Sequence, residues 1–521
     1  MPEHGGITRR SLLAAGAAAA AAELARPYTA LAALTKPSRP VLTERYLAAL
    51  SPHGVTLELD GAADLLGVQW RSPERPSIQL RFRTGSGRWT RWVSATGCLQ
   101  AHRERSLEGG EGGVGAPVWT GGATVVQLRS TPAASDVRLH AVDVSAGLGA
   151  RRRALLEMPL AAGALAHAGP LLQAGPGQPP IIARHVWARR GCHPSVAPEY
   201  GAVKLAFVHH TENPNGYPPG EVPAMLRAIY AFHRYVNGWD DIGYNFVIDL
   251  YGRIWEARAG GIDEPVTGAQ AGGYNLVSTG VAVLGTFMSV PISRAAQGAL
   301  ERLLAWKLSL HGVPANGHVE VSVNPAGASY SRYPANAHVS LPRVAGHRDG
   351  DSTDCPGNVL YGELKKIRAR VSEMAGRVAV ATLAASQPPS PQPTQEPQAP
   401  SGETVLLSGS LSYRAEPMPL PVAGAPILIQ ARSVADRGQI VHERTLAQLL
   451  TDANGDWSLS VSVTPAAKGG GVTLRVLCPG GAGLPVTVSE PLHLAGAVAL
   501  TPAAPPASPQ PSPQAVAPPA A

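Results

Sequence analysis

The sequence predicts a multidomain chain in which a central α/β domain, with a mixed β-sheet flanked by helices, lies between two all-β, sandwich-like domains. Strands alternate with helices over residues 175–378, which is typical of an α/β domain. Residues 40–150 and 403–498 contain series of short strand candidates, and residues 77–83 alternate apolar and polar residues with period two, which indicates a half-buried strand. The length of 521 residues agrees with about three domains, since one domain usually takes about 150 residues.

The composition is typical of folded domains and argues against several classes of protein. Hydrophobic residues make up 44% of the chain, which excludes disorder throughout. The net charge is +7, but the basic residues are scattered without interleaved aromatic residues, so nucleic-acid binding is not expected. No apolar run of about 18 residues lies beyond the N-terminus, so we expect no membrane span in the mature chain. Four cysteines are too few for a disulfide framework, and whether Cys98 and Cys192 form a bridge is left open.

Residues 1–32 have the layout of an export signal. Residues 8–13 read TRRSLL, and an alanine-rich run to residue 22 follows them. The two arginines favour a twin-arginine signal, whose pathway exports folded proteins, and an ordinary secretory signal is the alternative. We therefore expect an exported protein of the cell envelope or the extracellular space.

The N-terminal β module at residues 40–150 begins with two clear strands. Residues 77–83 read SIQLRFR and alternate strictly, and residues 88–93 read RWTRWV after a turn at 85–87. Residues 117–119 and 125–129 continue the pattern. A small β-sandwich is the natural prediction for such a series of short strands.

The central domain at residues 175–378 is expected to alternate between strands and helices. Apolar residues recur at helical spacing over 222–236, and Gly238 provides a stop signal. Ser293 is placed to cap a further helix. The expected elements are strands at 203–208, 244–250, 253–257 and 280–286, helices at 222–236, about 293–311 and about 359–374, and an inserted hairpin at 318–342.

The C-terminal part is predicted to be a second β-sandwich at residues 403–498. Residues 379–402 are rich in proline and are expected to form an extended, semi-rigid linker. Residues 499–521 form a proline- and alanine-rich tail without core-forming residues.

Three residues of the central domain have side chains suited to a catalytic zinc site. Zinc binds imidazole nitrogen and thiolate sulfur, and a catalytic site uses three protein ligands with one open position. His347 and Cys355 lie eight residues apart, and His209 and His210 end a strand. Neighbouring residues of a strand point to opposite faces, so only one of this pair reaches the metal, and the spacing does not say which. By spacing alone, a hydrogen-bonded histidine or a buried thiol in the core explains each residue equally well.

The central domain resembles the type 2 N-acetylmuramoyl-L-alanine amidases, a zinc-dependent family that includes phage amidases and animal peptidoglycan recognition proteins. The resemblance implies a zinc amidase that cuts between N-acetylmuramic acid and L-alanine, with the peptidoglycan glycan strand and stem peptide as partners. The matching segments follow the order of the family: FVHHT at 207–211, GWDDIGYNF at 238–246, GRIWEAR at 252–258, VAVLG at 281–285, GHRD at 346–349 and DCPG at 354–357.

The resemblance also implies a role for individual residues. It places zinc on His209, His347 and Cys355, a catalytic tyrosine at Tyr244 and a helper residue at Thr353. Family members that lack the cysteine bind cell wall without cutting it, so the presence of Cys355 favours an enzyme. A phenol at position 244 could donate a hydrogen bond to the developing oxyanion.

One departure from the family pattern concerns the substrate groove. Bacterial members usually carry histidine where this chain has Gln270, and glutamine forms hydrogen bonds but cannot take up a proton. We expect Trp239, Gln270 and Asn275 to contact the substrate. Two other hypotheses remain: a peptidoglycan-binding receptor without turnover, and a wall adhesin with a vestigial amidase domain. The sequence does not indicate a general base or an oligomeric state.

Overall fold

The computed structural model describes most of the chain between residues 40 and 500. The described residues are 40–71, 76–83, 87–96, 112–144, 178–188, 191–375, 379–386, 403–414, 418–434, 440–464, 472–480, 484, 486–494 and 497–500. Three predictions fall outside these residues: the export signal at 1–32, most of the linker and tail, and the possible disulfide between Cys98 and Cys192, because Cys98 is not described. Within the described residues, no helix is long and apolar enough to cross a membrane.

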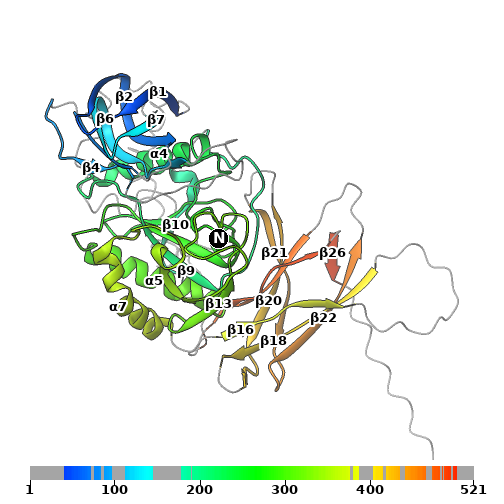
Figure 1. Cartoon of the computed structure of the whole chain (residues 1–521). Helices are drawn as coiled ribbons and strands as arrows, with labels where there is room; N and C mark the ends of the chain where they lie inside the picture. The colour runs from blue at the N-terminus through cyan, green and yellow to red at the C-terminus, as the bar shows by residue number, and fades with distance from the viewer. Residues whose placement is uncertain are drawn as a thin grey trace, which may run out of the picture.

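The N-terminal module forms one continuous antiparallel sheet, which corrects the expected two-sheet sandwich (Figure 1). The 17-residue strand β2 pairs with β6 along most of its length and with β7 over its second half. Register shifts between Glu58 and Leu65 let this single strand belong to both parts of the sheet, so no second sheet separates. The strands are β1 (Val41–Leu50), β2 (Val55–Arg71), β3 (Ser77–Arg83), β4 (Val93–Ser94), β5 (Gly112–Val114), β6 (Val118–Thr131) and β7 (Ala134–Asp143).

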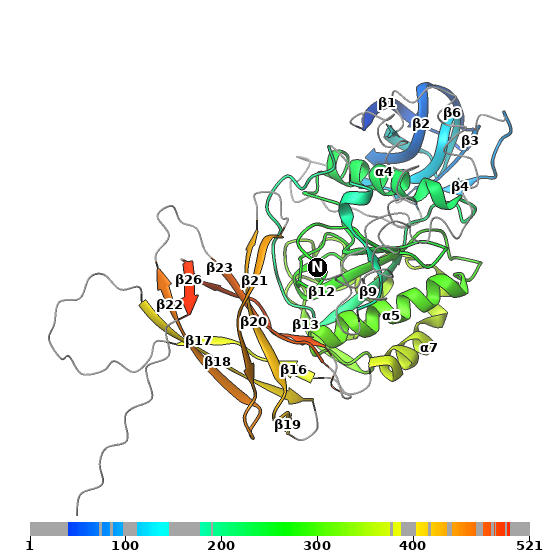
Figure 2. The ribbon, with the colours of Figure 1, turned by 180° about the vertical axis from the view of Figure 1, so that it is seen from behind.

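The central domain contains a six-stranded mixed sheet with helices on both faces. The sheet order is β15-β9-β12-β10-β11-β8, and the pair β10–β11 is antiparallel while the other pairs are parallel. Figure 2 shows α5 and α7 on one face and α4 on the side of the N-terminal module. The strands are β8 (Ile181–Ile182), β9 (Leu205–His210), β10 (Phe246–Ile248), β11 (Ile254–Glu256), β12 (Ser278–Val283) and β15 (Val344–Gly346).

The helices and the hairpin of the central domain agree with their sequence signals. Ser293 caps α5, because its hydroxyl accepts a hydrogen bond from the Ala296 N–H at 3.0 Å. The predicted insertion at 318–342 contains an antiparallel strand pair. The elements are α4 (Val222–Tyr235), α5 (Arg294–Leu310), α6 (His347–Gly350), α7 (Asn358–Ala375), β13 (His318–Ser322) and β14 (His338–Pro342).

The alternation of side chains along β9 decides which histidine can approach the candidate site. Val208 packs in the core beneath α5 and α7, whereas Phe207 packs on the opposite face with the β13–β14 hairpin. His209 therefore points to the same face as Phe207, and His210 points toward the α5 side. The prediction that the two histidines face opposite sides is confirmed.

The N-terminal module shares a hydrophobic core with the central domain. Leu65, Trp119 and Val142 of the module cluster with Met225 and Phe232 of α4, and all five side chains are buried. A Cβ atom added at Gly67 would lie 2.0 Å from the Phe232 ring, so only glycine permits this approach. The module is therefore part of the packing around α4 and not a loosely tethered unit.

The C-terminal part forms two sheets around a common core. One sheet has the order β16-β18-β22-β26 with β17 and β19 on β18, and the other has the order β21-β20-β23-β24 with β25 on β23. Buried residues from both sheets, including Leu407, Trp457, Ile429 and Val476, form one cluster. The strands are β16 (Ala379–Ala381), β17 (Ala384–Ser386), β18 (Glu403–Tyr413), β19 (Leu420–Pro421), β20 (Pro426–Val434), β21 (Ile440–Leu450), β22 (Asp456–Thr464), β23 (Val472–Cys478), β24 (Thr487–Val488), β25 (Leu492–Leu494) and β26 (Ala497–Leu500).

The structure corrects the start of the predicted linker at 379–402. Residues of β16 and β17 precede the proline-rich segment and pair with β18, which follows it. These strands are short and rich in alanine, so their sequence signal is weak. The proline-rich residues that follow them led to the prediction of a linker over the whole range. The strands that flank the proline-rich segment therefore belong to the same domain, the C-terminal one. The predicted tail likewise begins inside β26.

A buried charge cluster joins the C-terminal domain to the central domain. Asp263 of the central domain pairs with Arg432 at 2.8 Å and with Arg475 at 2.6 Å, and Arg432 also pairs with Glu264. Both arginine side chains are at most 5% exposed. Burial raises the pKa of Asp263, but the ion pairs with Arg475 and Arg432 outweigh that effect and hold this pKa below its usual range.

We predict that Arg432→Met destabilises the chain by about 3–5 kcal/mol, because removing one partner leaves buried carboxylates insufficiently compensated. The control Lys366→Met removes an exposed ion pair with Glu363 and should cost at most about 1 kcal/mol. A carboxylate with a lowered folded-state pKa stabilises the fold above its unfolded pKa of about 3.9 and loses this contribution as the pH falls. Urea unfolding at pH 7 and pH 3 should show the Arg432 effect shrinking in acid; an effect equal to that of Lys366→Met would contradict the prediction.

Candidate metal centre

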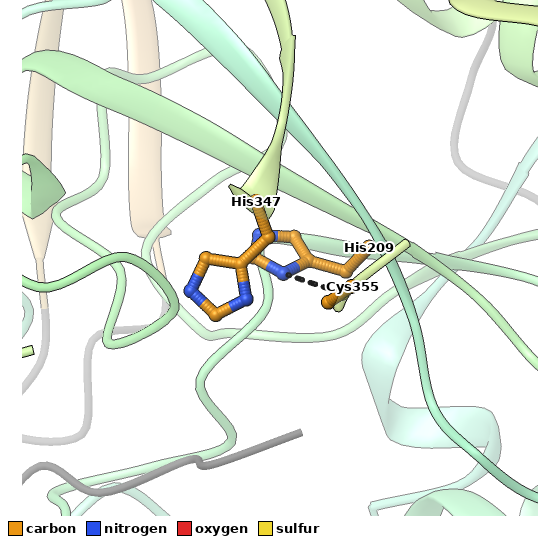
Figure 3. Close-up of side chains that lie close together, drawn as sticks. All are labelled: His209, His347 and Cys355. Atoms are coloured by element: carbon orange, nitrogen blue, oxygen red, sulfur yellow. Dashed lines mark hydrogen bonds between the residues drawn. The ribbon is translucent and has the colours of Figure 1, made fainter. Parts of the chain in front are cut away.

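Two histidines and a cysteine converge at the ends of two neighbouring parallel strands (Figure 3). His209 is the penultimate residue of β9, His347 begins α6 directly after β15, and Cys355 lies in the loop before α7. One ligand atom from each residue lies within 4.8 Å of the other two. The three side chains are buried. The fold thus brings together the three residues predicted as ligands.

The donor set and its spacing fit a zinc ion. The His209 Nδ1 atom lies 3.7 Å from the Cys355 Sγ atom. Zn–N bonds of about 2.0 Å and Zn–S bonds of about 2.3 Å, at a tetrahedral angle, imply a separation of about 3.5 Å between such atoms. Zinc binds imidazole and thiolate readily, whereas magnesium and calcium prefer oxygen ligands, so the donor set also favours zinc.

A chain of hydrogen bonds fixes which nitrogen of His209 is free to bind a metal. The Ser278 hydroxyl donates to the Tyr274 carbonyl oxygen at 2.8 Å, so it accepts from the Gln270 Nε2 group at 2.9 Å. The amide of Gln270 is thereby oriented, and its Oε1 atom lies 2.6 Å from His209 Nε2. Because this oxygen can only accept, Nε2 must carry the proton. The lone pair of His209 therefore resides on Nδ1, which faces Cys355.

A carboxylate orients His347 in the same manner. Asp351 Oδ2 lies 2.9 Å from His347 Nε2 and also accepts the Gly272 N–H at 2.7 Å. The Nδ1 atom of His347 is then the nitrogen available to a metal. Burial lowers the pKa of His347, but hydrogen bonds to Asp351 and Cys355 outweigh it and raise that pKa to about 10. Burial and the neighbouring His347 lower the pKa of His209, which favours the neutral form that can bind a metal.

The backbone around Cys355 positions its sulfur. The Thr353 hydroxyl oxygen accepts the Cys355 N–H at 3.2 Å, which shapes the loop and leaves the Thr353 O–H as a donor. The His210 N–H donates to the sulfur at 3.4 Å. Ala116, a fully buried residue of the N-terminal module, packs against Cys355. The N-terminal module therefore reaches the candidate metal centre.

Tyr244 lies beside the ligands at the end of a well-anchored loop. Its ring centroid is 5.3 Å from that of His209 and 5.6 Å from that of His233 on α4. Asp241 anchors the loop, since its carboxylate accepts the Ile242 N–H at 2.8 Å and pairs with Arg184. Tyr244 therefore lies next to the candidate metal centre, and its catalytic role stays a prediction.

The other predicted substrate contacts lie in the packing around the site. Trp239 is 6% exposed and stacks on His233 with a centroid distance of 4.5 Å. Asn275 accepts the N–H groups of Gln270 and Ala271 through its Oδ1 atom at 2.9 and 3.0 Å, which closes a local turn. The contact of Trp239 and Asn275 with substrate stays a prediction. In the structure, Trp239 packs on His233 and Asn275 closes the turn that contains Gln270.

Two parts of the site were absent from the sequence analysis. Asp351 follows His347 by four residues, and this spacing could have indicated that both side chains lie on one side of a helical turn. Ala116 carried no signal, because a small residue far from Cys355 in the chain reveals its contact only after folding.

The comparisons with known proteins agree with this geometry. A family model described as N-acetylmuramoyl-L-alanine amidase matches residues 199–358. A peptidoglycan-recognition protein of Drosophila melanogaster is 30% identical over 187 residues, which cover 36% of this chain and 86% of that protein.

Solved structures match the same part of the chain. Peptidoglycan recognition protein LE in complex with tracheal cytotoxin, a monomeric diaminopimelic acid-type peptidoglycan, is 25% identical; the match covers 36% of this chain and 92% of that one, with a TM-score of 0.28. An N-acetylmuramoyl-L-alanine amidase, the endolysin LysCS of Clostridium intestinale, is 21% identical over 37% of this chain and 95% of that one, with a TM-score of 0.26.

We predict that Gln270→Leu weakens zinc affinity by about 10–100-fold, because His209 loses the acceptor that holds its proton on Nε2. Gln270→Glu keeps an acceptor and should retain affinity, which makes it the matched control. Competition with a chromophoric chelator measures both variants, and circular dichroism checks that both are folded. Equal zinc affinities for the two variants would show that the hydrogen bond from position 270 does not orient His209 for metal binding.

Proposed function

The chain belongs to the family of type 2 N-acetylmuramoyl-L-alanine amidases and peptidoglycan recognition proteins, and on that premise we propose that it is an exported zinc amidase. Its substrate would be the amide bond between N-acetylmuramic acid and L-alanine in bacterial peptidoglycan. The observation that carries the proposal is the buried set of His209, His347 and Cys355, whose two imidazole rings are already oriented by hydrogen bonds.

The residues of the site have complementary tasks in this proposal. When bound, zinc supplies a Lewis acid that polarises the amide carbonyl and activates water. Gln270 and Asp351 hold the two imidazoles with Nδ1 toward the metal position. Thr353 shapes the Cys355 loop and retains a donor hydrogen. Tyr244, next to His209, donates a hydrogen bond to the carbonyl oxygen as negative charge develops on it.

Peptidoglycan is the proposed partner, and the cell envelope is the proposed location. The relative in complex with tracheal cytotoxin binds a peptidoglycan fragment, which supports the same class of ligand here. The export signal expected at residues 1–32 supports export, with the twin-arginine route as the finer proposal. A net charge of +7 suits an anionic envelope.

A peptidoglycan-binding receptor without turnover is the second candidate. Gln270 favours it, because glutamine stands where bacterial amidases usually have a histidine and cannot transfer protons. The complete His-His-Cys set favours the enzyme, since binding alone does not require three prepared metal ligands.

Digestion of purified peptidoglycan separates the two candidates. Mass spectrometry of the products should detect stem peptides with a free L-alanine amino terminus and glycan with unsubstituted muramic acid. Cys355→Ala should yield neither product and should retain little zinc, because one of three protein ligands is lost. Zinc-loaded wild-type protein that binds peptidoglycan and releases no such peptides would establish the receptor.

Tyr244→Phe should lower kcat by about 10²–10³-fold, the usual cost of removing one preorganised donor to an oxyanion. The ring remains, so packing beside His209 and zinc content should not change. If Tyr244 only packed in the core, loss of its hydroxyl would cost about 1 kcal/mol of stability and leave kcat unaltered. Measuring kcat, zinc content and thermal stability of the variant and the wild type distinguishes these outcomes.

A further inference from the structure

A row of alternating arginine and tryptophan side chains lies on the N-terminal module. The order along the row is Arg129, Trp92, Arg81, Trp89 and Arg83, here called the Arg–Trp ladder. The guanidinium carbons lie 4.2 to 5.1 Å from the centroids of the adjacent rings. From the sequence, the basic residues are expected to be scattered without interleaved aromatic residues. The antiparallel strands β3 and β6 correct this, because they bring residues 81 and 129 together.

The strand geometry keeps the ladder on the outer face of the sheet. Ile78, Leu80 and Phe82 of β3 point into the core, so Arg81 and Arg83 point outward. The ladder tryptophans are half-buried, and Arg83 is exposed.

Neutral partners hold two of the ladder arginines in place. Arg81 donates to Gln127 at 2.7 Å, and Arg129 donates to Gln79 at 2.7 and 2.9 Å. These glutamines fix the side chains without neutralising their charge, so a preformed cationic and aromatic surface results.

Among the described residues, the arginines of this surface, Arg81, Arg83 and Arg129, have no acidic partner at salt-bridge distance. Residues 76–96 contain four arginines and no aspartate or glutamate, and β6 adds Arg129 and no acid. Across the strand pair Arg81 lies opposite Gln127 and Arg129 lies opposite Gln79, so the residues that face these arginines carry no compensating charge. An anionic partner would supply the missing counter-charge.

We propose that the Arg–Trp ladder binds the peptidoglycan strand outside the metal centre. Carboxylates of the stem peptides pair with the guanidinium groups, and sugar rings contact the exposed surface of the half-buried tryptophans beside them. This inference rests on the proposed function, which supplies a carboxylate-bearing glycan as the substrate. It also uses the shared core with α4 and the contact of Ala116 with Cys355, which fix the module against the metal domain. A strand held on the ladder is therefore held at a fixed position relative to the site.

The test compares binding and turnover in the full chain. The ladder variant Arg81→Gln/Arg83→Gln/Arg129→Gln and the control Arg45→Gln/Arg138→Gln, which removes charges of the same module that pair with Asp60 and Glu44, are sedimented with purified sacculi. The ladder variant should bind about tenfold more weakly at low salt, as expected from the loss of three ion pairs at partly or fully exposed arginines, and the difference should shrink at high salt. The control should bind like the wild type.

A second variant and a second substrate keep the outcomes distinct. Trp92→Ala should weaken sacculus binding at both salt concentrations, because stacking is not screened by ions. Turnover of a soluble muropeptide too short to span both surfaces should stay unchanged in every variant. Sacculus binding equal to the wild type in the ladder variant overturns the inference. Binding to single-stranded DNA is measured alongside, and a ladder variant that loses binding to DNA but not to sacculi also overturns it. An inactive wild type that still needs the ladder for binding overturns the proposed function alone.

Discussion

The hydrogen bond between Gln270 and His209 is the constraint on which the candidate metal centre depends. It is the last of three bonds that begin at the Tyr274 carbonyl and pass through Ser278, and each bond determines the direction of the next. A backbone carbonyl thus decides which nitrogen of an imidazole is basic. A glutamine at position 270 performs this orienting task without a titratable group, so its departure from the family pattern does not by itself remove the means of preparing the ligand.

The helix α4 shows how strongly the three parts of the chain depend on one another. Met225 and Phe232 lie on a helix that packs between the central sheet and the N-terminal module, so neither neighbour can be removed without exposing apolar surface. At the other end of the central domain, Asp263 and Glu264 pair with arginines of the C-terminal sandwich. Domains that look separable from composition are joined by an apolar contact on the N-terminal side, and by buried ion pairs together with the packing of Val486 and Val488 on the C-terminal side.

The sequence predicted those features that depend on local pattern or on a contiguous motif. The Ser293 cap, the spacing of apolar residues on α4 and the opposite directions of His209 and His210 follow from helix and strand periodicity. The segments that match the family pattern predicted His347 and Cys355 as metal ligands. Contacts between distant segments could not be predicted, because nothing local specifies them: the pairing of β16 with β18, the packing of Ala116 on Cys355, and the meeting of Arg129 with Trp92.

The pairing of β16 and β17 with β18 changes what the proline-rich stretch can do in evolution. In a linker between domains, each added residue alters the reach and relative position of the two bodies. Here both ends of the stretch are attached to neighbouring strands of one sheet, at Ser386 and Glu403. Lengthening a closed loop costs free energy only logarithmically. Insertions and deletions between these two residues should therefore cost little free energy, while the spacing of the central and C-terminal domains stays constant.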